Sequence, residues 1–199
     1  MSFALLVAMF LCGYLPGSIP FGVLIARAHG IDLRQVGSGN IGATNAARAL
    51  GRAWGVVVLV LDAAKAAVPM LLVGRFQPMV QAGGPWTPVV VGAGAFVGHL
   101  WPIFFRLRGG KGVATAFGAF LVLQPAAALA GLLTYALVYG ATRISSVGSL
   151  AAALLFPLWL YLLQAPPAHM IFAAMVLALI LWRHRSNIAR LVRRREPRL

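Results

Sequence analysis

Acidic residues are scarce in this sequence: three of its 199 residues are Asp or Glu, against seventeen lysines and arginines. The three acids, Asp32, Asp62 and Glu196, lie far apart along the chain. Enzymes that use two divalent metal ions need closely placed carboxylates to hold them. The sequence therefore argues against alcohol phosphotransferases and polymerase-like enzymes, and we expect neither a metal nor another cofactor.

Cysteine and the common nucleophile motifs are also rare or missing. The single cysteine, Cys12, lies in an apolar run, which excludes an internal disulfide and a thiolate metal cluster. No G-x-S-x-G elbow occurs, and no set of Ser, His and Asp is evident. The polar residues that remain suit the holding of phosphate rather than covalent catalysis.

Apolar residues, by contrast, make up 61% of the chain, and the mean hydropathy is +0.88. This composition is typical of an integral membrane protein. The net charge of +14 must lie in a few loops, which favours an anionic partner. Nucleic acid is not expected, because no separate soluble domain remains to bind it, and a phospholipid or a phosphorylated metabolite fits better.

The apolar residues form six segments, and a membrane span needs about 20 residues. The first segment lacks a preceding basic residue and a clear cleavage site, so we expect it to remain as a span rather than act as a secretory signal. The fourth is about 30 residues long, which suits either one tilted helix or two short ones. The segments are 3–26, 53–74, 86–105, 112–142, 147–163 and 168–182.

Positive charge decides between these alternatives. If 112–142 crosses twice, turning at Gln124-Pro125, fifteen of the seventeen Lys and Arg residues are cytoplasmic, Lys65 lies within a span and Arg75 faces out. We therefore predict an all-α polytopic membrane protein with seven transmembrane helices, the N-terminus outside and the C-terminus cytoplasmic. Residues 1–199 are expected to form one domain, with short cytoplasmic glycine-rich loops forming the site. Two crossings in this length require helices shorter than the bilayer.

The stretch GSGNIGATN, residues 37–45, matches the G-x-G-x-x-G dinucleotide fingerprint. That fingerprint needs a preceding strand and a soluble βαβ unit, whereas here a transmembrane helix is predicted before it. Asp62, at about the right distance downstream, lies inside the next apolar span. The match to an NAD site is therefore rejected as an accident of glycine spacing.

The same stretch is typical of an anion site. Its glycines let the backbone approach a ligand, and Arg48 adds a cation that can form two hydrogen bonds. Thr44 or Asn45 is expected to cap a helix whose N-terminal amides favour phosphate. The alternative is a glycine-rich connector with an ordinary cap and an interfacial arginine. The residues concerned are Gly37, Ser38, Gly39, Asn40, Gly42, Thr44 and Asn45.

A second cluster, GHLWPIFFRLRGGKGVAT at residues 98–115, places Gly109, Gly110 and Lys111 just before a predicted helix. It is not a P-loop, because the required first glycine is missing and no Ser or Thr follows the lysine. A lysine held by glycines at a helix start still suits a phosphate. The cluster's Trp101, Phe104 and Phe105 are typical of an interfacial aromatic belt rather than a binding box.

Three further residues in or near the spans allow two interpretations each. His99 is either an interhelical hydrogen-bond partner or a catalytic base. Asp62 and Lys65 are three residues apart within a span, where ionisable groups pair or serve a function. A structural ion pair is the favoured interpretation for them.

The third cluster consists of RISSVGS, residues 143–149, and RHRSNI, residues 183–188. His184 and Asn187 are three residues apart, so they share a helix face and point an imidazole and an amide in one direction. The alternative is a charged helix end that lies on an anionic leaflet.

GSGNIGATN, GHLWPIFFRLRGGKGVAT and HRSNI, in this order, resemble the acyl-phosphate-dependent glycerol-3-phosphate acyltransferases of bacteria, the PlsY family; GSIPFG at 17–22 and LDAAK at 61–65 look familial too. The resemblance covers essentially the whole chain. It implies a seven-span enzyme of the bacterial inner membrane with its site at the cytoplasmic face. The expected reaction makes lysophosphatidic acid and phosphate from acyl phosphate and sn-glycerol 3-phosphate, with no CoA or acyl carrier protein as direct donor.

The resemblance also implies site residues and a monomeric enzyme of phospholipid synthesis. Residues that match the family as catalytic are His184, Asn187, Lys111, Ser38 and Asn40. Those that match as substrate-binding are Gly39, Thr44, Asn45, Arg48, Gly109, Gly110 and Ser149. We expect the 38–45 loop, with the amides of Gly109 and Gly110, to bind the acyl-phosphate head group. Arg48, Lys111 and Ser149 are expected to hold glycerol 3-phosphate, while His184 and Asn187 orient its hydroxyl.

The base and the function class each leave alternatives. His184 or the oxygens of the acyl phosphate can take the proton. A transporter for an anionic metabolite is one rival, since seven spans with basic glycine-rich breaks would also serve it. A membrane anchor with a basic tail is the other.

Overall fold

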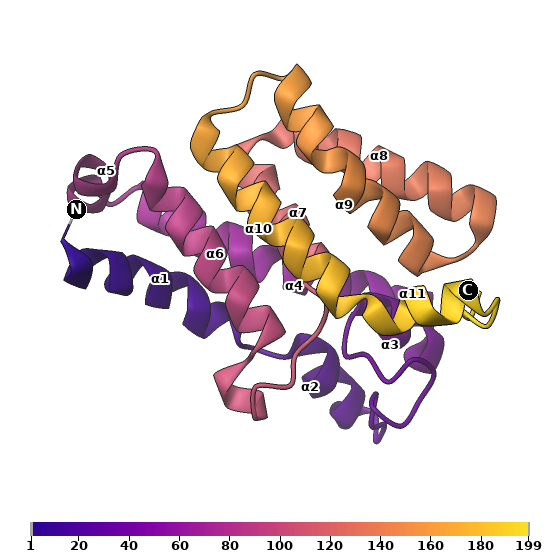
Figure 1. The fold of residues 1–199 in the computed structure, drawn as a ribbon. Helices are drawn as coiled ribbons and strands as arrows, with labels where there is room; N and C mark the ends of the chain where they lie inside the picture. Colours follow the sequence, from indigo (N-terminus) through magenta and orange to yellow (C-terminus); the bar gives the residue numbers. More distant parts are fainter. Residues whose placement is uncertain (1, 199) are drawn as a thin grey trace. The chain divides into compact units, whose positions relative to one another are not determined.

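The computed structural model describes residues 2–198, and all regular secondary structure in that range is helical (Figure 1). The absence of strands confirms the predicted all-α class and agrees with the rejection of a dinucleotide-binding βαβ unit. The helices are α1 (Phe3–Gly17), α2 (Phe21–Ala28), α3 (Ala43–Leu50), α4 (Arg52–Gly74), α5 (Gln77–Gly83), α6 (Trp86–Leu100), a 3₁₀ turn (Ile103–Phe105), α7 (Val113–Leu123), α8 (Pro125–Thr142), α9 (Ser145–Leu162), α10 (Pro167–Arg183) and α11 (Arg185–Val192).

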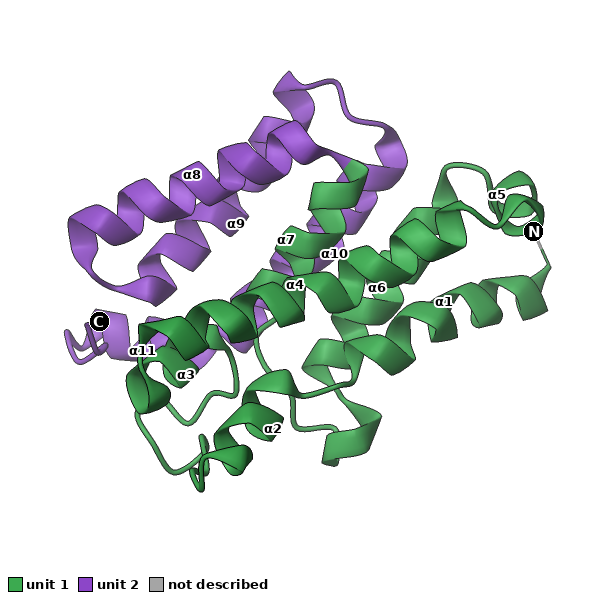
Figure 2. Cartoon of the chain, turned by 180° about the vertical axis from the view of Figure 1, so that it is seen from behind, with its two compact units in different colours: residues 1–123 green, residues 124–199 purple. Residues whose placement is uncertain are grey.

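The chain divides into two compact units, residues 1–123 and residues 124–199, which Figure 2 colours separately. Unit 1 holds α1 to α7 and both glycine-rich loops, and unit 2 holds α8 to α11. The first two polar clusters, which contain the glycine-rich loops, therefore belong to unit 1. The third cluster, residues 143–149 and 183–188, belongs to unit 2.

Five stretches are long and apolar enough to cross a membrane: Phe3–Ala28, Arg52–Gly74, Trp86–Phe105, Pro125–Thr142 and Ser145–Leu162. Helices α10 and α11 add a sixth if they are taken as one span bent by 55°. The apolar helix α7 is shorter than these. The apolar segments read from the sequence thus reappear as helices, while the count of seven crossings and their orientation stay predictions.

The predicted break within 112–142 is present at the expected residue. Helix α7 ends at Leu123 and α8 begins at Pro125, with Gln124 between them at φ −150° and ψ 79°. The cause is local, because a residue before proline avoids the helical region and proline itself fits the first turn of the next helix.

In unit 1, α1 and α6 pack backbone against backbone through glycines. A Cβ atom added to Gly13 or Gly17 of α1 would overlap backbone atoms of Val91 or Ala95. The same holds in reverse for Gly94 and Gly98 of α6, which face backbone atoms of α1. Each helix thus carries two glycines four residues apart, the spacing that lets membrane helices approach closely.

Unit 2 is built on the antiparallel pair α8 and α9, which is joined by polar side chains as well as by packing. Trp159 Nε1 donates a hydrogen bond to Thr134 Oγ1 at 3.3 Å, and the hydroxyl groups of Tyr135 and Ser145 are 3.1 Å apart. Such bonds satisfy polar groups that lipid cannot.

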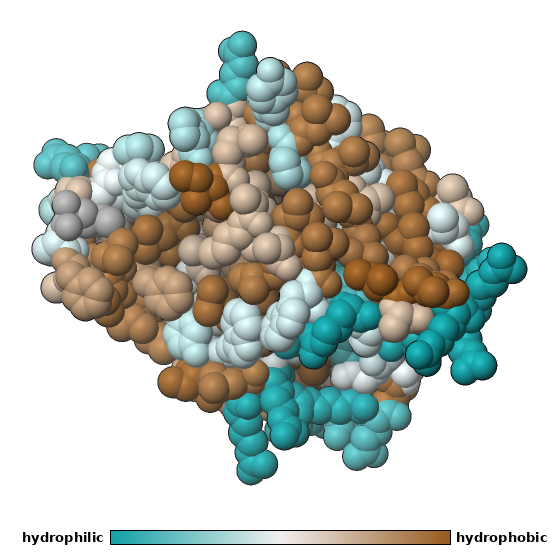
Figure 3. All heavy atoms as spheres, viewed as in Figure 1, coloured by the Kyte–Doolittle hydropathy of each residue, from teal (hydrophilic) through white to brown (hydrophobic). Residues whose placement is uncertain are grey.

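Large apolar side chains are exposed along most helices, including Leu72 of α4, Leu137 of α8 and Ile171 of α10. On the face drawn in Figure 3, apolar side chains cover most of the surface. Contiguous apolar surface of this extent is unfavourable in water and matches a lipid environment.

Candidate functional site

The first glycine-rich loop, residues 37–42, owes its shape to two glycines and one asparagine. Gly37 and Gly39 have positive φ values of 57° and 67°, which glycine adopts without strain. Asn45 is fully buried; its Oδ1 accepts from the Ser38 amide at 3.0 Å, and its Nδ2 donates to the carbonyls of Leu33 and Val36 at 2.8 and 2.9 Å. The amide of Asn45 thus folds the loop, which favours a shaping role over the direct substrate contact expected for it.

The helix that follows this loop differs from the expected one at its cap. Gly42 is the N-cap of α3 and no side chain caps the helix, so the predicted cap by Thr44 or Asn45 is wrong. Both residues lie inside the helix because the turn at Gly42 places its start before them. Arg48 lies in the last turn of α3, and its Cδ is 3.4 Å from the position a Cβ on Gly37 would occupy. The arginine thus passes beside the loop that contains the half-buried Ser38, Gly39 and Asn40.

The second loop packs on the end of α6. The Gly109 amide donates to the Leu100 carbonyl at 3.2 Å, and the Gly110 amide donates to the His99 carbonyl at 3.1 Å. A Cβ on Gly109 would overlap the His99 carbonyl oxygen, so this close approach requires glycine. Because these two amides donate to carbonyls of α6, the structure favours a loop-shaping role for them over the expected donation to the acyl-phosphate head group. Lys111 follows them and is half-buried.

Arg34 joins the two loops. Its Nη2 donates to the carbonyl of Arg108 at 2.7 Å, and its guanidinium lies 4.3 Å from the centre of the Phe105 ring. The guanidinium of Arg27 lies over the same ring at 5.4 Å. Phe105 therefore packs against two guanidinium groups, and the Arg34–Arg108 bond brings the segments that carry the two loops to one end of unit 1.

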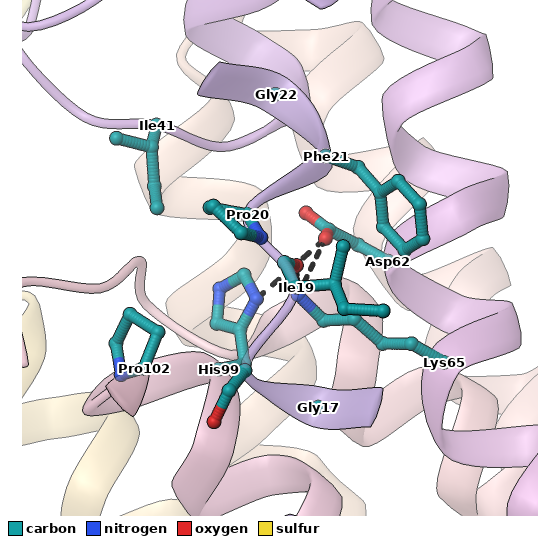
Figure 4. Close-up of a pocket in the computed structure, with 11 residues that line it drawn as sticks. Gly17, Ile19, Pro20, Phe21, Gly22, Ile41, Asp62, Lys65, His99 and Pro102 are labelled. Atoms are coloured by element: carbon teal, nitrogen blue, oxygen red, sulfur yellow. Dashed lines mark hydrogen bonds and ion pairs between the residues drawn. The ribbon is translucent and has the colours of Figure 1, made fainter. Parts of the chain in front are cut away.

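A buried polar network lines a small pocket to which Ile41 of the first loop also contributes (Figure 4). Lys65 Nζ is 2.8 Å from Asp62 Oδ1, which confirms the predicted ion pair, and it also donates to the Ile19 carbonyl at 3.0 Å. His99 Nδ1 is 3.7 Å from the same Asp62 oxygen. The three side chains line a small pocket together with Ser18, Pro20, Gly22 and Ile41. Sequence spacing predicted the pair on α4 but gave no sign that His99 of α6 joins it.

In unit 2, His184 sits at the 55° bend between α10 and α11 and is 2% exposed. Its Nδ1 is 2.9 Å from the Ile180 carbonyl oxygen. A carbonyl only accepts, so Nδ1 bears the proton and the neutral ring keeps its lone pair on Nε2. This is the tautomer that a general base acting through Nε2 requires.

Asn187 follows His184 by one helical turn and is fixed by Glu196. Its Nδ2 donates to Glu196 Oε1, which also accepts from Ser146 Oγ at 2.8 Å. Arg190 Nε donates to the other oxygen at 2.6 Å. Among the described residues, the buried Oδ1 of Asn187 has no hydrogen-bond partner, so it is the atom that can accept a bond from a ligand hydroxyl.

Glu196 is the member of this group of residues that sequence reasoning missed. Burial raises the pKa of its carboxyl, but the hydrogen bonds from Asn187, Ser146 and Arg190 outweigh this and hold the pKa below its ordinary value. One clue was available, since it is a single acid in a tail of arginines. Ser149 lies one turn after Ser146 on α9 and is buried, so the serine expected to bind substrate shares a helix face with the one that binds Glu196.

Comparison with known proteins decides the family. The sequence profile described as glycerol-3-phosphate acyltransferase matches residues 7–194. The chain belongs to this family. A glycerol-3-phosphate acyltransferase of Anaeromyxobacter sp. (strain Fw109-5) is 55% identical over 192 residues, covering 94% of this chain and 93% of the relative. The one of Aquifex aeolicus (strain VF5) is 42% identical over 188 residues, covering 93% and 94%.

Solved structures agree with the family assignment. A crystal structure of PlsY (YgiH), an integral membrane glycerol 3-phosphate acyltransferase, in its glycerol 3-phosphate form is 39% identical with a TM-score of 0.90, over 98% of this chain and 95% of that one. The lysophosphatidic acid form is 38% identical with a TM-score of 0.87, over the same shares. The predicted membership of the PlsY family is confirmed, and the protein is a multi-pass membrane acyltransferase of phospholipid synthesis.

Proposed function

We propose that this acyltransferase moves a fatty acyl group from acyl phosphate to the 1-hydroxyl of sn-glycerol 3-phosphate. The products are lysophosphatidic acid and inorganic phosphate, and neither CoA nor acyl carrier protein serves as the direct donor. The assignment of glycerol 3-phosphate as the acyl acceptor rests on the family match over residues 7–194, together with the glycerol 3-phosphate form of the similar PlsY structure. The choice of donor rests on the resemblance of the sequence motifs and on the chemistry below.

The reaction needs no acyl-enzyme intermediate. The hydroxyl oxygen of glycerol 3-phosphate attacks the acyl carbonyl carbon, a C–O bond forms, and the bond from that carbon to the phosphate oxygen breaks. Acyl phosphate is a mixed anhydride, so phosphate is a good leaving group and positioning supplies much of the rate. This fits a site of Ser, Asn, Lys, Arg and His, without a covalent nucleophile.

The groups of unit 1 suit the phosphates. Ser38, Gly39, Asn40 and Thr44 lie at the first loop and serve the acyl-phosphate head group. Arg48 and Lys111 supply the two cations and hold the phosphate of glycerol 3-phosphate. Asn45, Gly109 and Gly110 act by giving the two loops their shape, as their hydrogen bonds indicate.

The groups of unit 2 suit the attacking hydroxyl. Nε2 of His184 takes the proton of the hydroxyl, and Oδ1 of Asn187 accepts a hydrogen bond from the same hydroxyl. Ser149 binds the phosphate group of glycerol 3-phosphate. The acyl-phosphate oxygens remain the alternative proton acceptor.

The proposed enzyme is a monomer of the bacterial inner membrane with seven spans, its N-terminus outside and its site and C-terminus cytoplasmic. The short α7 and the long α8 supply two of these crossings, as the distribution of basic residues favours. The acyl chain enters between helices from the bilayer, where apolar contacts already surround it.

The deciding experiment uses purified protein in lipid nanodiscs with labelled glycerol 3-phosphate. Palmitoyl phosphate and palmitoyl-CoA are offered separately, and labelled lysophosphatidic acid is measured. Product from palmitoyl phosphate alone supports both the reaction and the donor. Product mainly from palmitoyl-CoA keeps the acyl transfer but overturns the donor. Uptake of label into proteoliposomes without product would instead indicate a transporter.

A further inference from the structure

The polar network of Asp62, Lys65 and His99 is buried deeply. Asp62, Lys65 and His99 are 2%, 6% and 5% exposed. Burying charged groups costs free energy that pairing only partly offsets, so such a network is weak evidence for stability alone. The α1 and α6 helices are already joined by close glycine contacts and do not need it to pack. We therefore ask which neighbouring residues the network holds in position.

His99 touches the second loop in two ways. Its carbonyl accepts the Gly110 amide at 3.1 Å. A Cβ added to Gly110 would overlap Nε2 of the His99 ring and lie 2.8 Å from Cε1 and 3.2 Å from Cδ2. The α-carbon of Gly110 therefore rests on the edge of the imidazole, one residue before Lys111.

The other edge of the ring faces Asp62. Its Nδ1 is 3.7 Å from Asp62 Oδ1, an oxygen that is also held by Lys65 at 2.8 Å. Lys65 is in turn bonded to the Ile19 carbonyl at the break between α1 and α2. The ring is thus supported from α4 on one side and supports the loop on the other, as Figure 4 shows for its Asp62 side.

We propose that His99 is a positioning residue: oriented by Asp62, its imidazole supports Gly110 and so places Lys111 for binding of the glycerol 3-phosphate phosphate group. This inference rests on the proposed function, which assigns Lys111 to that phosphate. In this proposal His99 transfers no proton and acts on substrate affinity through the position of Lys111.

The test is a double-mutant cycle of His99→Ala and Gly110→Ala, read by the KM values for both substrates and by binding of labelled glycerol 3-phosphate in equilibrium dialysis without a donor. We expect His99→Ala to raise the KM and Kd for glycerol 3-phosphate about tenfold, with the KM for palmitoyl phosphate nearly unchanged. Gly110→Ala should weaken binding similarly in the wild type, because the new methyl group strikes the ring. In the His99→Ala background it should add little.

His169→Asn is the matched control, since His169 is a second buried histidine, on α10 in unit 2. It should lower the Tm without changing the KM for glycerol 3-phosphate. If His99→Ala does not fold, His99→Asn replaces it, because the shorter amide can still face Asp62 while it leaves Gly110 unsupported.

A fall in Tm with an unchanged Kd, or penalties of His99→Ala and Gly110→Ala that simply add, would overturn the inference. A failure of the proposed function gives a different result from a failure of this inference. If wild type binds glycerol 3-phosphate in a His99-dependent way but forms no product from palmitoyl phosphate, the positioning role stands and the donor assignment fails.

Discussion

In unit 1 the glycines of the two loops lie in close contact with neighbouring side-chain and backbone atoms, whereas in unit 2 the residues around Asn187 are held by a single carboxylate, Glu196. The first arrangement leaves no room for added atoms, as the contacts at Gly37, Gly109 and Gly110 show. The second depends on three donors that converge on one acceptor group. Unit 1 should therefore fail when atoms are added, and unit 2 when a charge or a hydrogen-bond partner is removed.

The largest expected effect is that of Gly13→Leu in α1. A side chain there overlaps the Val91 carbonyl and separates α1 from α6, which should remove folded protein or lower its stability by about 3 kcal/mol or more. Gly140→Leu in α8 is the control, because nothing lies within 4 Å of a Cβ at that position. Yield of monodisperse protein and the Tm in detergent measure both. Equal behaviour of the two variants would contradict close packing as the cause.

His184→Gln should reduce turnover by about 100-fold or more, because a general base contributes at least that much. The pH profile of kcat should also lose the limb that reports protonation of the base. A small loss of turnover that does not vary with pH would indicate that the acyl-phosphate oxygens, and not His184, accept the proton. Circular dichroism checks that the helices persist.

Glu196→Gln should destabilise the protein by about 1–3 kcal/mol, since the neutral amide replaces an acceptor of three hydrogen bonds. It should also lower kcat, because Asn187 is no longer held in one orientation. Glu196→Ala is expected to be at least as damaging. Asp32→Asn is the control, because Asp32 is an exposed acid that bonds local groups only. A Glu196→Gln variant with the Tm of the wild type would contradict the claim that this carboxylate stabilises unit 2.

The smallest expected effect is one of pH on the same carboxylate. Its pKa in the folded protein lies below the ordinary value of 4.5, so its contribution to stability is complete above about pH 4.5 and is lost as the pH falls through the lowered pKa. The Tm difference between wild type and Glu196→Gln should therefore stay constant from pH 7 to about 5 and narrow below that. A Tm difference that widens in acid would mean that folding raises the pKa of Glu196 instead of lowering it.

Features set by neighbours in sequence were predictable. The break at Gln124 follows from Pro125, and the Asp62–Lys65 pair follows from their spacing on one helix. The site motifs were also found, because glycine and polar residues contrast with an apolar chain. The crossing count stays a prediction, since α7 is short for a span.

Features set by distant parts of the chain were not predictable. Spacing could not show that the amides of Gly109 and Gly110 meet carbonyls of α6, so they were expected to face a ligand. For the same reason Asn45 was read as a donor to substrate, although it holds the Leu33 and Val36 carbonyls. The glycine pairs of α1 and α6 could have been read, since two glycines four residues apart in an apolar segment indicate helix association.

The bond between Lys65 and the Ile19 carbonyl also bears on biosynthesis. Ile19 lies at an interruption of the first apolar segment and leaves the ribosome 46 residues before the lysine that binds it. The first segment therefore emerges from the ribosome before its ammonium partner does. Its interrupted backbone acquires that partner only when α4 arrives beside it, so insertion of the second long helix completes the folding of the first.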